Sequence, residues 1–236
     1  MKRLLPFLII LAVLGVAVGS AWYLRRTANS PAGVTNVGGS PSRPGAAATP
    51  TVSTITAPGA NPPHIKGSPT ASVTIEEFGD FECPPCALFH PILNTMHNEF
   101  GDRIKIIFRE YPLVPNHEHA LYAASAAEAA ALQGKFWAMH HKLYENQKDW
   151  HEAFDVRPIF DGYAKQIGLD MERFKQDINA DVVARRITED GKRARSLNVK
   201  GTPTVFMNGR EVPFETIMDA GRLRNAINAE LANARR

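Results

Sequence analysis

The two cysteines of this chain lie three positions apart, in the segment Cys83-Pro84-Pro85-Cys86. With no third cysteine in the sequence, the pair can bond to each other, bind a metal together or stay reduced. A disulfide that closes so short a ring constrains the unfolded chain little, so its value lies in being formed and broken. The spacing therefore predicts redox chemistry.

A helix is predicted to begin at Cys83, and this would make the two thiols chemically different. The unpaired N–H groups and partial positive charge of a helix N-terminus stabilise a thiolate there. We therefore expect the pKa of Cys83 to fall below 7, from about 8.5 for a free cysteine. Pro84 and Pro85 have no N–H to donate, which leaves the Cys86 N–H to help. Cys86 lies deeper in the helix and is expected to be the resolving thiol.

The elements around this pair predict an α/β fold. Residues 72–78 are β-branched and alternating, a helix is expected from Cys83 to about Phe100, and residues 104–109 read as a second strand. Residues 117–197 are rich in helix formers, with breaks near Gly134, Trp150, Gly168 and Asp181.

The last part of the chain predicts a hairpin and a closing helix. Residues 203–207 and 211–213 flank Asn208-Gly209, a strong signal for a tight turn. Residues 216–232 have the pattern of an amphipathic helix.

Two motifs in this order resemble those of the DsbA-type thiol oxidoreductases. They are the run from Phe78 to Cys86 and the segment Gly201-Thr202-Pro203-Thr204 before the hairpin. The resemblance covers about His64 to Ala232. It implies a thioredoxin fold with a central mixed sheet and an all-helical subdomain inserted at about residues 112–197.

The resemblance also implies a role for Glu77, which lies where thioredoxin-fold proteins carry a buried acid beneath the disulfide. Strand alternation places Glu77 on the same face as Val73 and Ile75. By analogy, Glu77 would take or return the proton of Cys86. The alternative is a salt-bridged glutamate at a strand end.

Pro203 matches the cis-proline of this family, which faces the disulfide. A cis bond would turn the Thr202 backbone toward the sulfurs, so that a substrate strand could pair with it. The alternative is an ordinary trans turn proline. DsbA itself is known for a histidine directly before its second cysteine, where this chain has Pro85. We therefore expect a redox potential between those of thioredoxin and DsbA.

The N-terminal segment predicts export. Residues 4–24 form an apolar run that follows Lys2 and Arg3, and its length matches the roughly 20 residues needed to span a bilayer. An uncleaved anchor is favoured, and a signal peptide cleaved near Gly19-Ser20-Ala21 is the alternative. Either would place the thiols in an oxidising compartment.

Composition divides the chain into three parts: an anchor or signal at 1–26, a tether at 27–63 and the folded domain at 64–236. The tether is rich in Ala, Gly, Ser, Thr and Pro, which bury too little apolar surface to offset the entropy of ordering.

Charge and histidine spacing exclude other classes. The net charge is +3, and the basic residues at 185–195 are interrupted by Glu189 and Asp190, so we expect a solvated helix face and no nucleic-acid partner. The histidines, including the adjacent His140 and His141, form no ligand spacing with the cysteines, so neither a metal nor an organic cofactor is expected.

The sequence thus predicts an exported oxidoreductase that exchanges disulfides with cysteine-containing polypeptides, most favourably as a dithiol oxidase. It would lie at the extracytoplasmic face of a bacterial membrane. A quinone-linked membrane partner of the DsbB kind would reoxidise its cysteine pair. Alternatives are a reductase or isomerase of the same fold, or a non-catalytic protein that carries a metal or binds polypeptides.

Overall fold

The computed structural model describes residues 56–114 and 116–234. The expected anchor or signal segment and most of the expected tether lie outside these residues. Within the described ranges, no helix combines the length and apolar character that a bilayer crossing requires.

The described residues form a five-stranded mixed sheet with the order β1-β3-β2-β4-β5. Strands β2 and β3 are parallel, and the other neighbouring pairs are antiparallel. The mixed sheet confirms the α/β prediction, although the short edge strand β1 was not predicted. The strands are β1 (His64–Gly67), β2 (Val73–Gly79), β3 (Ile104–Glu110), β4 (Thr204–Met207) and β5 (Arg210–Val212).

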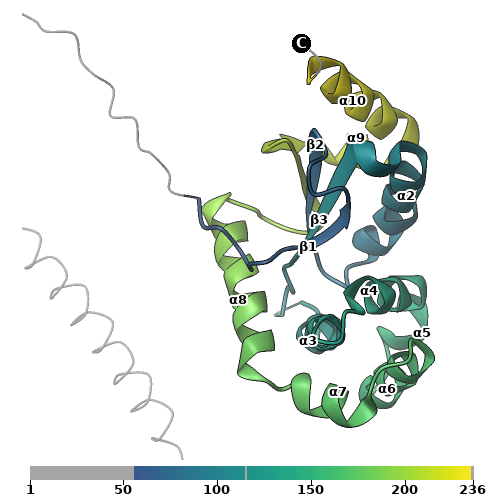
Figure 1. The fold of residues 1–236 in the computed structure, drawn as a ribbon. Helices are drawn as coiled ribbons and strands as arrows, with labels where there is room; N and C mark the ends of the chain where they lie inside the picture. The colour runs from purple at the N-terminus through teal and green to yellow at the C-terminus, as the bar shows by residue number, and fades with distance from the viewer. Residues whose placement is uncertain (1–55, 115, 235–236) are drawn as a thin grey trace, which may run out of the picture. The chain divides into compact units, whose positions relative to one another are not determined.

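One face of the sheet packs against helices α2 (Pro84–Phe100) and α10 (Ala220–Asn233), which lie together on one side of it in Figure 1. The apolar residues of this face alternate along the strands, as Val73 and Ile75 do on β2. Phe89 and Met96 of α2 are fully buried against them. This packing fixes the start of α2 above the end of β2.

The turn between β4 and β5 confirms the hairpin predicted at Asn208-Gly209. Both residues have positive φ, 49° and 78°, which asparagine and glycine tolerate best. The single helix expected at residues 216–232 is instead two helices, α9 (Phe214–Ile217) and α10. The helical structure is interrupted between them. The Asp219 side chain caps α10 by accepting a hydrogen bond from the Arg222 N–H at 2.9 Å.

Six helices lie between β3 and β4, where helices were expected (Figure 1). They are α3 (Ala120–Ala131), α4 (Phe136–Glu145), α5 (Gln147–Trp150), α6 (Arg157–Gln166), α7 (Met171–Asp177) and α8 (Asp181–Ser196). Their common core contains the fully buried Trp150 and Phe160, and it extends to Phe81, Cys83 and Cys86. The helical layer therefore covers the cysteine pair.

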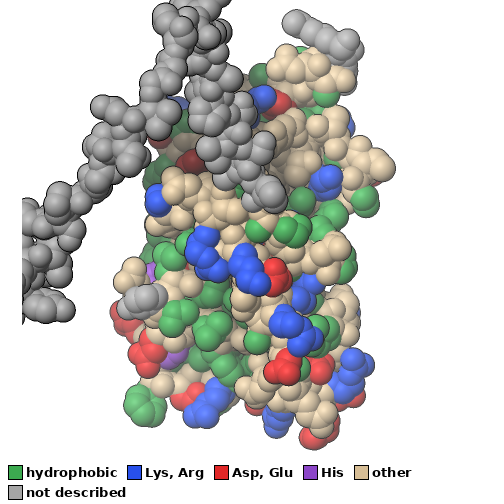
Figure 2. Space-filling view, turned by 90° about the vertical axis from the view of Figure 1, so that its left-hand side faces the viewer, with side chains coloured by type: hydrophobic (Ala, Val, Ile, Leu, Met, Phe, Trp, Pro, Cys, Tyr) green, Lys and Arg blue, Asp and Glu red, His purple; other side chains and the backbone are tan. Residues whose placement is uncertain are grey.

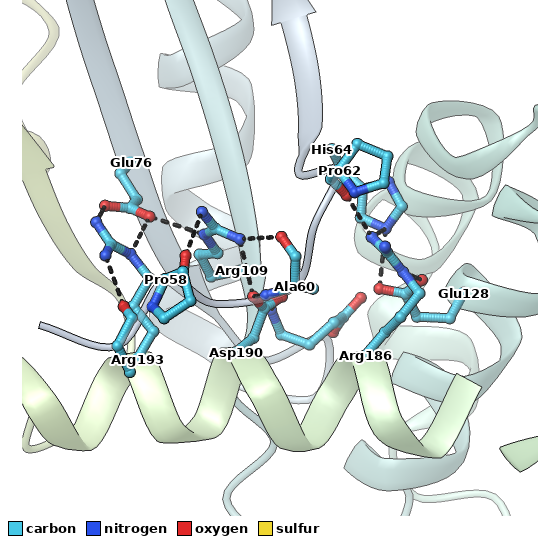
Figure 3. A network of polar contacts seen from close by, with 12 residues as sticks. Pro58, Ala60, Pro62, His64, Glu76, Arg109, Glu128, Arg186, Asp190 and Arg193 are labelled. Atoms are coloured by element: carbon cyan, nitrogen blue, oxygen red, sulfur yellow. Dashed lines mark hydrogen bonds and ion pairs between the residues drawn. The ribbon is translucent and has the colours of Figure 1, made fainter. Parts of the chain in front are cut away.

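Helix α8 packs against the sheet through a buried polar network, shown in Figure 3. Arg109 donates to Glu76 at 2.7 Å and to Asp190 at 3.0 Å, and Arg193 donates to both carboxylate oxygens of Glu76 at 2.7 Å. Burial would raise the pKa of Glu76, but the hydrogen bonds from Arg193 and Arg109 hold it below its ordinary value. These contacts join α8 to β2 and β3.

This network corrects the expectation that the basic residues of α8 form a wholly solvated face. Arg193 turns inward to Glu76, and Arg186 donates to the buried Glu128 at 2.6 Å. Arg185, Lys192 and Arg195 are exposed, as expected. Figure 2 shows basic and acidic side chains interspersed on the face that it presents, rather than one continuous basic patch.

The same network binds part of the segment that was expected to be a tether. The N–H of the buried Ala60 donates to Asp190 at 2.7 Å, and its carbonyl oxygen accepts from Arg109 at 2.8 Å (Figure 3). The carbonyl oxygen of Ala57 accepts from Arg193 at 2.9 Å. The boundary predicted at His64 is therefore too late, because residues 57–63 belong to the folded unit. Composition alone did not reveal these partners, which are distant in sequence.

Candidate active site

Cys83 is the N-cap residue of α2, and Pro84 occupies the first turn, where its missing N–H costs no hydrogen bond. The Cys83 N–H donates to the Asp80 carbonyl oxygen at 3.1 Å. Gln147 of α5 donates from its side chain to the carbonyl oxygens of Cys83 at 3.0 Å and Phe81 at 2.7 Å. The helical layer thus holds the backbone on which the first cysteine sits.

The two cysteines are free thiols in this structure, and both are buried. The hydrogen bond from the Cys86 thiol outweighs the effect of burial and lowers the pKa of Cys83 to about 6. Burial and the neighbouring Cys83 raise the pKa of Cys86 well above its ordinary value. One thiol is therefore largely ionised at neutral pH while the other keeps its proton.

Glu77 lies beneath this pair on β2, between Phe108 of β3 and Val205 of β4. It is 2% exposed, and its Oε1 atom has no hydrogen-bond partner among the described residues. Burial and then the charge of Cys83 raise the pKa of Glu77 to about 8. The salt-bridged alternative holds for its neighbour Glu76, whereas Glu77 is a buried acid that keeps its proton at neutral pH.

The peptide bond between Thr202 and Pro203 is cis, as the sequence analysis expected. The Cys83 thiol donates to the Thr202 carbonyl oxygen, at a distance of 3.3 Å from Sγ. When the thiol ionises, that contact loses its proton. The buried Thr202 hydroxyl, which has no partner among the described residues, is then an available donor, and hydrogen bonding by this side chain also lowers the pKa of Cys83. The cis segment therefore contacts the first sulfur directly.

Sequence reasoning missed a second layer of contacts around the loop before Cys83. The carboxylate of Asp80 accepts hydrogen bonds from the Glu82 N–H at 2.8 Å, the Leu113 N–H at 2.8 Å and His117 Nδ1 at 2.7 Å. Burial opposes protonation of His117, but the hydrogen bond to Asp80 raises its pKa above the ordinary value. Asp80 lies in the recognised motif, whereas nothing local in the sequence marks His117.

A cavity of about 560 Å³ opens beside the first turn of α2. Its lining includes Pro84, Ala87 and Leu88 of that helix, together with Tyr144 of α4. The Leu88 side chain is 63% exposed. The site therefore has an apolar, partly open surface next to its cysteine pair.

Three of the histidines, His90 of α2 and the adjacent His140 and His141 of α4, come together, although their spacing along the chain indicated no ligand set. One ring nitrogen of each residue lies within 4.8 Å of one from each of the others. Spacing along the chain does not reveal this cluster, because His90 comes from another helix than His140 and His141.

The sheet, the cis-proline loop and a cysteine pair at a helix N-terminus define a thioredoxin-fold dithiol protein. Residues 60–229 match the family model described as "Thioredoxin", and the chain belongs to this family. Its folded part is DsbA-like, as the motifs predicted.

Solved structures of thiol oxidoreductases resemble it. BdbD from Bacillus subtilis, in its oxidised form, is 25% identical with a TM-score of 0.64, and the match covers 75% of this chain and 98% of that one. The thiol-disulfide exchange protein alpha-DsbA2 from Wolbachia pipientis is 26% identical with a TM-score of 0.61, over 71% and 86% of the two chains. These matches support thiol–disulfide oxidoreductase activity in general.

A curated relative is named as an ion antiporter and not as a thiol oxidoreductase. The Na(+)/H(+) antiporter NhaA 1 of Mycolicibacterium gilvum is 38% identical over 170 residues, which are 70% of this chain and 26% of the antiporter. The chain thus spans about a quarter of the length of the curated relatives it matches. The likeness concerns that part alone.

Proposed function

We propose that this chain is an extracytoplasmic dithiol oxidase, which donates the Cys83–Cys86 disulfide to cysteine-containing polypeptides. The observation that carries the proposal is the inequality of the two thiols. A pKa of about 6 makes Cys83 the better leaving group, and a pKa well above the ordinary value makes Cys86 the thiol that ends protonated.

The oxidation follows from these properties in two displacements. A substrate thiolate attacks Sγ of Cys83, the Cys83–Cys86 bond breaks, and Cys86 leaves with the electron pair. The protonated carboxyl of Glu77 supplies a proton to Cys86. A second substrate thiolate then attacks the substrate sulfur of the mixed disulfide and releases Cys83 as a thiolate. The substrate loses two electrons, and the enzyme pair gains them.

Substrate placement would depend on the cis-proline segment. The Thr202 carbonyl oxygen already lies 3.3 Å from Sγ of Cys83. An extended polypeptide that pairs with the backbone of Thr202 would bring its own sulfur to Cys83. The apolar surface around Leu88 would contact the flanking residues of such a chain.

The cellular setting is part of the proposal and rests on the sequence. Residues 4–24 would hold the protein at the membrane, or direct its export, and a shorter tether than expected would link them to the folded unit. A quinone-linked membrane protein would reoxidise Cys83 and Cys86, because each turnover leaves them reduced.

A trapping experiment tests this function. In Cys86→Ala, the Cys83 thiolate can still attack a disulfide of an exported protein, but no Cys86 thiol is present to displace that protein, so covalent complexes should accumulate, whereas Cys83→Ala should form none. These complexes contain the same mixed disulfide that the proposed oxidation passes through. The disulfide form of the purified protein should also oxidise a dithiol peptide with one-to-one stoichiometry. If Cys86→Ala captures no protein and the dithiol peptide stays reduced, the proposal is wrong.

A reductase or isomerase is the second candidate, and the moderate pKa of Cys83 favours it. A value of about 6 stabilises the reduced form less than the lowest thiol pKa values of oxidising relatives would. Under this alternative, the purified protein would be reduced in the cell envelope, and it would reshuffle a scrambled multi-disulfide substrate faster than it oxidises a dithiol peptide.

A further inference from the structure

Three imidazoles form a cluster between α2 and α4, outside the redox pair. His90 Nε2 and His141 Nδ1 are 3.0 Å apart, and the ring centroids of His90 and His140 are 5.2 Å apart. One nitrogen from each ring lies within 4.8 Å of the others. His90 and His140 are buried, and His141 is half-buried.

His140 has no structural explanation in the polar contacts of the protein. Its side chain is 3% exposed, and both ring nitrogens lack a hydrogen-bond partner among the described residues. A buried polar group left unpaired costs about 1–3 kcal/mol. Its ring packs edge-on against Phe108 and Trp137, where a phenylalanine would avoid that cost. A missing partner for His140 would explain its presence.

The protonation states suit a metal better than an anion. Burial, with the nearby His141 and Lys66, lowers the pKa of His90 to about 3, and burial also lowers the pKa of His140 well below the ordinary value. Both rings are therefore neutral at physiological pH. A neutral imidazole with a free nitrogen lone pair is the form that binds transition metals.

We propose that His90, His140 and His141 form a binding site for a divalent transition metal ion of the zinc class. Two imidazole nitrogens at 2.0–2.1 Å from a tetrahedral Zn²⁺ lie about 3.3 Å apart. The nitrogens of His90 and His141 would therefore need to separate by only a few tenths of an ångström from their present 3.0 Å. The third ligand, from His140, would satisfy one of the two unpaired nitrogens.

The surroundings provide access to the site. His90, Asn94 and Tyr144 line the 560 Å³ cavity beside α2, so an ion can reach the cluster from the solvent side. Three histidines leave a fourth position of a tetrahedral ion open to a water molecule from this cavity. The site is distinct from the cysteines, although His90 lies one helical turn beyond Cys86 on α2.

Lys66 limits the affinity of the site. Its Nζ atom lies 3.3 Å from His141 Nε2 and donates to Asn94 Oδ1 at 3.0 Å. An ammonium group next to one of the three ligand residues repels a metal cation bound there. Removal of the lysine should therefore strengthen metal binding, whereas removal of a histidine should weaken it.

Opposite effects of these substitutions provide the test. The full chain is kept in its disulfide form, so that the cysteines offer no thiolate ligand, and Zn²⁺ is titrated against a chromogenic chelator. We expect one Zn²⁺ per chain and an upward shift of the thermal unfolding midpoint on binding. The partly buried His151 lies outside the cluster and provides a control, and His151→Gln should bind as the parent does.

His141→Gln should lose at least about tenfold in Zn²⁺ affinity, and Lys66→Met should gain several-fold. His140→Phe should lose at least as much as His141→Gln. If His140→Phe does not fold, substitutions at the half-buried His141 and Lys66 still test the proposal, because they should change the Zn²⁺ affinity in opposite directions. No bound Zn²⁺, or equal affinity in the parent, His141→Gln and Lys66→Met proteins, would overturn the proposal.

Discussion

At the scale of single residues, the two sulfurs differ because the pKa of the Cys83 thiol is lowered and that of the Cys86 thiol is raised. Cys83 is stabilised as a thiolate by a hydrogen bond from Cys86, and Cys86 retains its proton because it is buried beside Cys83 and Glu77. Each pKa thus depends on the neighbouring group. A substitution at one of these positions should therefore shift the pKa that is measured at another.

The first prediction concerns the thiolate of Cys83. Its alkylation rate by iodoacetamide should rise with a midpoint near pH 6, so that about nine-tenths is ionised at pH 7. Cys86→Ala removes the strongest stabilising hydrogen bond and should raise the midpoint by about 1–2 units. Cys86→Ser keeps a donor and should shift it less. Equal midpoints in the two variants would show that this hydrogen bond does not control the pKa of Cys83.

The second prediction concerns the buried acid Glu77. Its pKa is about 8 in the folded protein against 4.5 ordinarily, so the folded state holds a proton that the unfolded chain releases. This contribution to stability is complete below pH 4.5 and is lost as the pH rises to about 8. The free energy of unfolding should therefore fall by about 1.4 kcal/mol per pH unit in that window, relative to Glu77→Gln.

The measurement for Glu77 is denaturant unfolding of both proteins in the disulfide form. Reduced Cys83 would contribute with the opposite sign, because its lowered pKa adds stability above pH 9 that is lost as the pH falls through about 6. The disulfide removes that opposing contribution. It also removes the charge of Cys83, so burial alone then raises the Glu77 pKa, and the window should end below pH 8. Parallel stability curves for the parent and Glu77→Gln would mean that the Glu77 pKa is not raised.

At the scale of elements, strand β2 serves two purposes through its two faces. Glu77 points toward α2 and the cysteines, whereas Glu76 points toward α8 and pairs with Arg109 and Arg193. The alternation of a strand thus separates an isolated acid from a paired one. Helix α8 is attached to the sheet through the paired acid, Glu76.

The third prediction concerns the pairing of Arg109. Its side chain is 6% exposed and is shared between Glu76 and the buried Asp190. Arg109→Met would leave both carboxylates without this partner, and we expect a loss of about 3–5 kcal/mol in the free energy of unfolding. Arg157 pairs with Asp155 at the exposed surface, where solvent screens the charges, so Arg157→Met should change stability far less than Arg109→Met. Similar losses in both variants, measured by urea unfolding, would contradict this difference.

Local patterns in the sequence predicted the elements that depend on neighbouring residues. The β2–α2–β3 unit, the hairpin at Asn208-Gly209 and the buried face of Glu77 all follow from periodicity or turn chemistry. What the sequence could not predict depends on partners distant along the chain. Asp190 fixes Ala60 across 130 residues, and His90 meets His141 across 51.

The roles of the site residues divide in the same way. Motifs predicted roles for Cys83, Cys86 and the cis-proline, because these residues lie in short, recognisable segments. Asp80 and His117 were missed as a pair, because they meet only when the loop after β3 folds back on the loop after β2. Contacts between loops have no periodic signal in the sequence.

At the scale of the whole molecule, two structural layers meet at the cysteine pair. The sheet layer supplies Glu77 and the Thr202–Pro203 segment, and the helical layer supplies Gln147. Cys83 and Cys86 belong to the apolar core of the helical layer, although they lie on a helix that packs on the sheet. The potential of the pair therefore reports on how both layers stabilise the reduced form.

The last prediction is this potential. A pKa of about 6, against about 7 for the corresponding thiol of thioredoxin, stabilises the reduced form at pH 7 by about a factor of five, which is roughly 20 mV for a two-electron couple. Relative to about −270 mV for thioredoxin, we expect roughly −250 mV. Structural disulfides of secreted proteins lie below about −300 mV, so transfer of the disulfide to a substrate would be favourable by about 2.3 kcal/mol.

Equilibration with glutathione buffers between pH 5 and pH 8 would measure this potential and its pH dependence. Because Cys83 loses its proton near pH 6, the slope should change from about 59 mV per pH unit below that value to about 30 mV above it. A couple at or below the potential of thioredoxin, with a constant slope through pH 7, would favour the reductase. A potential of roughly −250 mV with the change of slope would support the oxidase, because a Cys83 that leaves as a thiolate at neutral pH makes release of the oxidised substrate favourable.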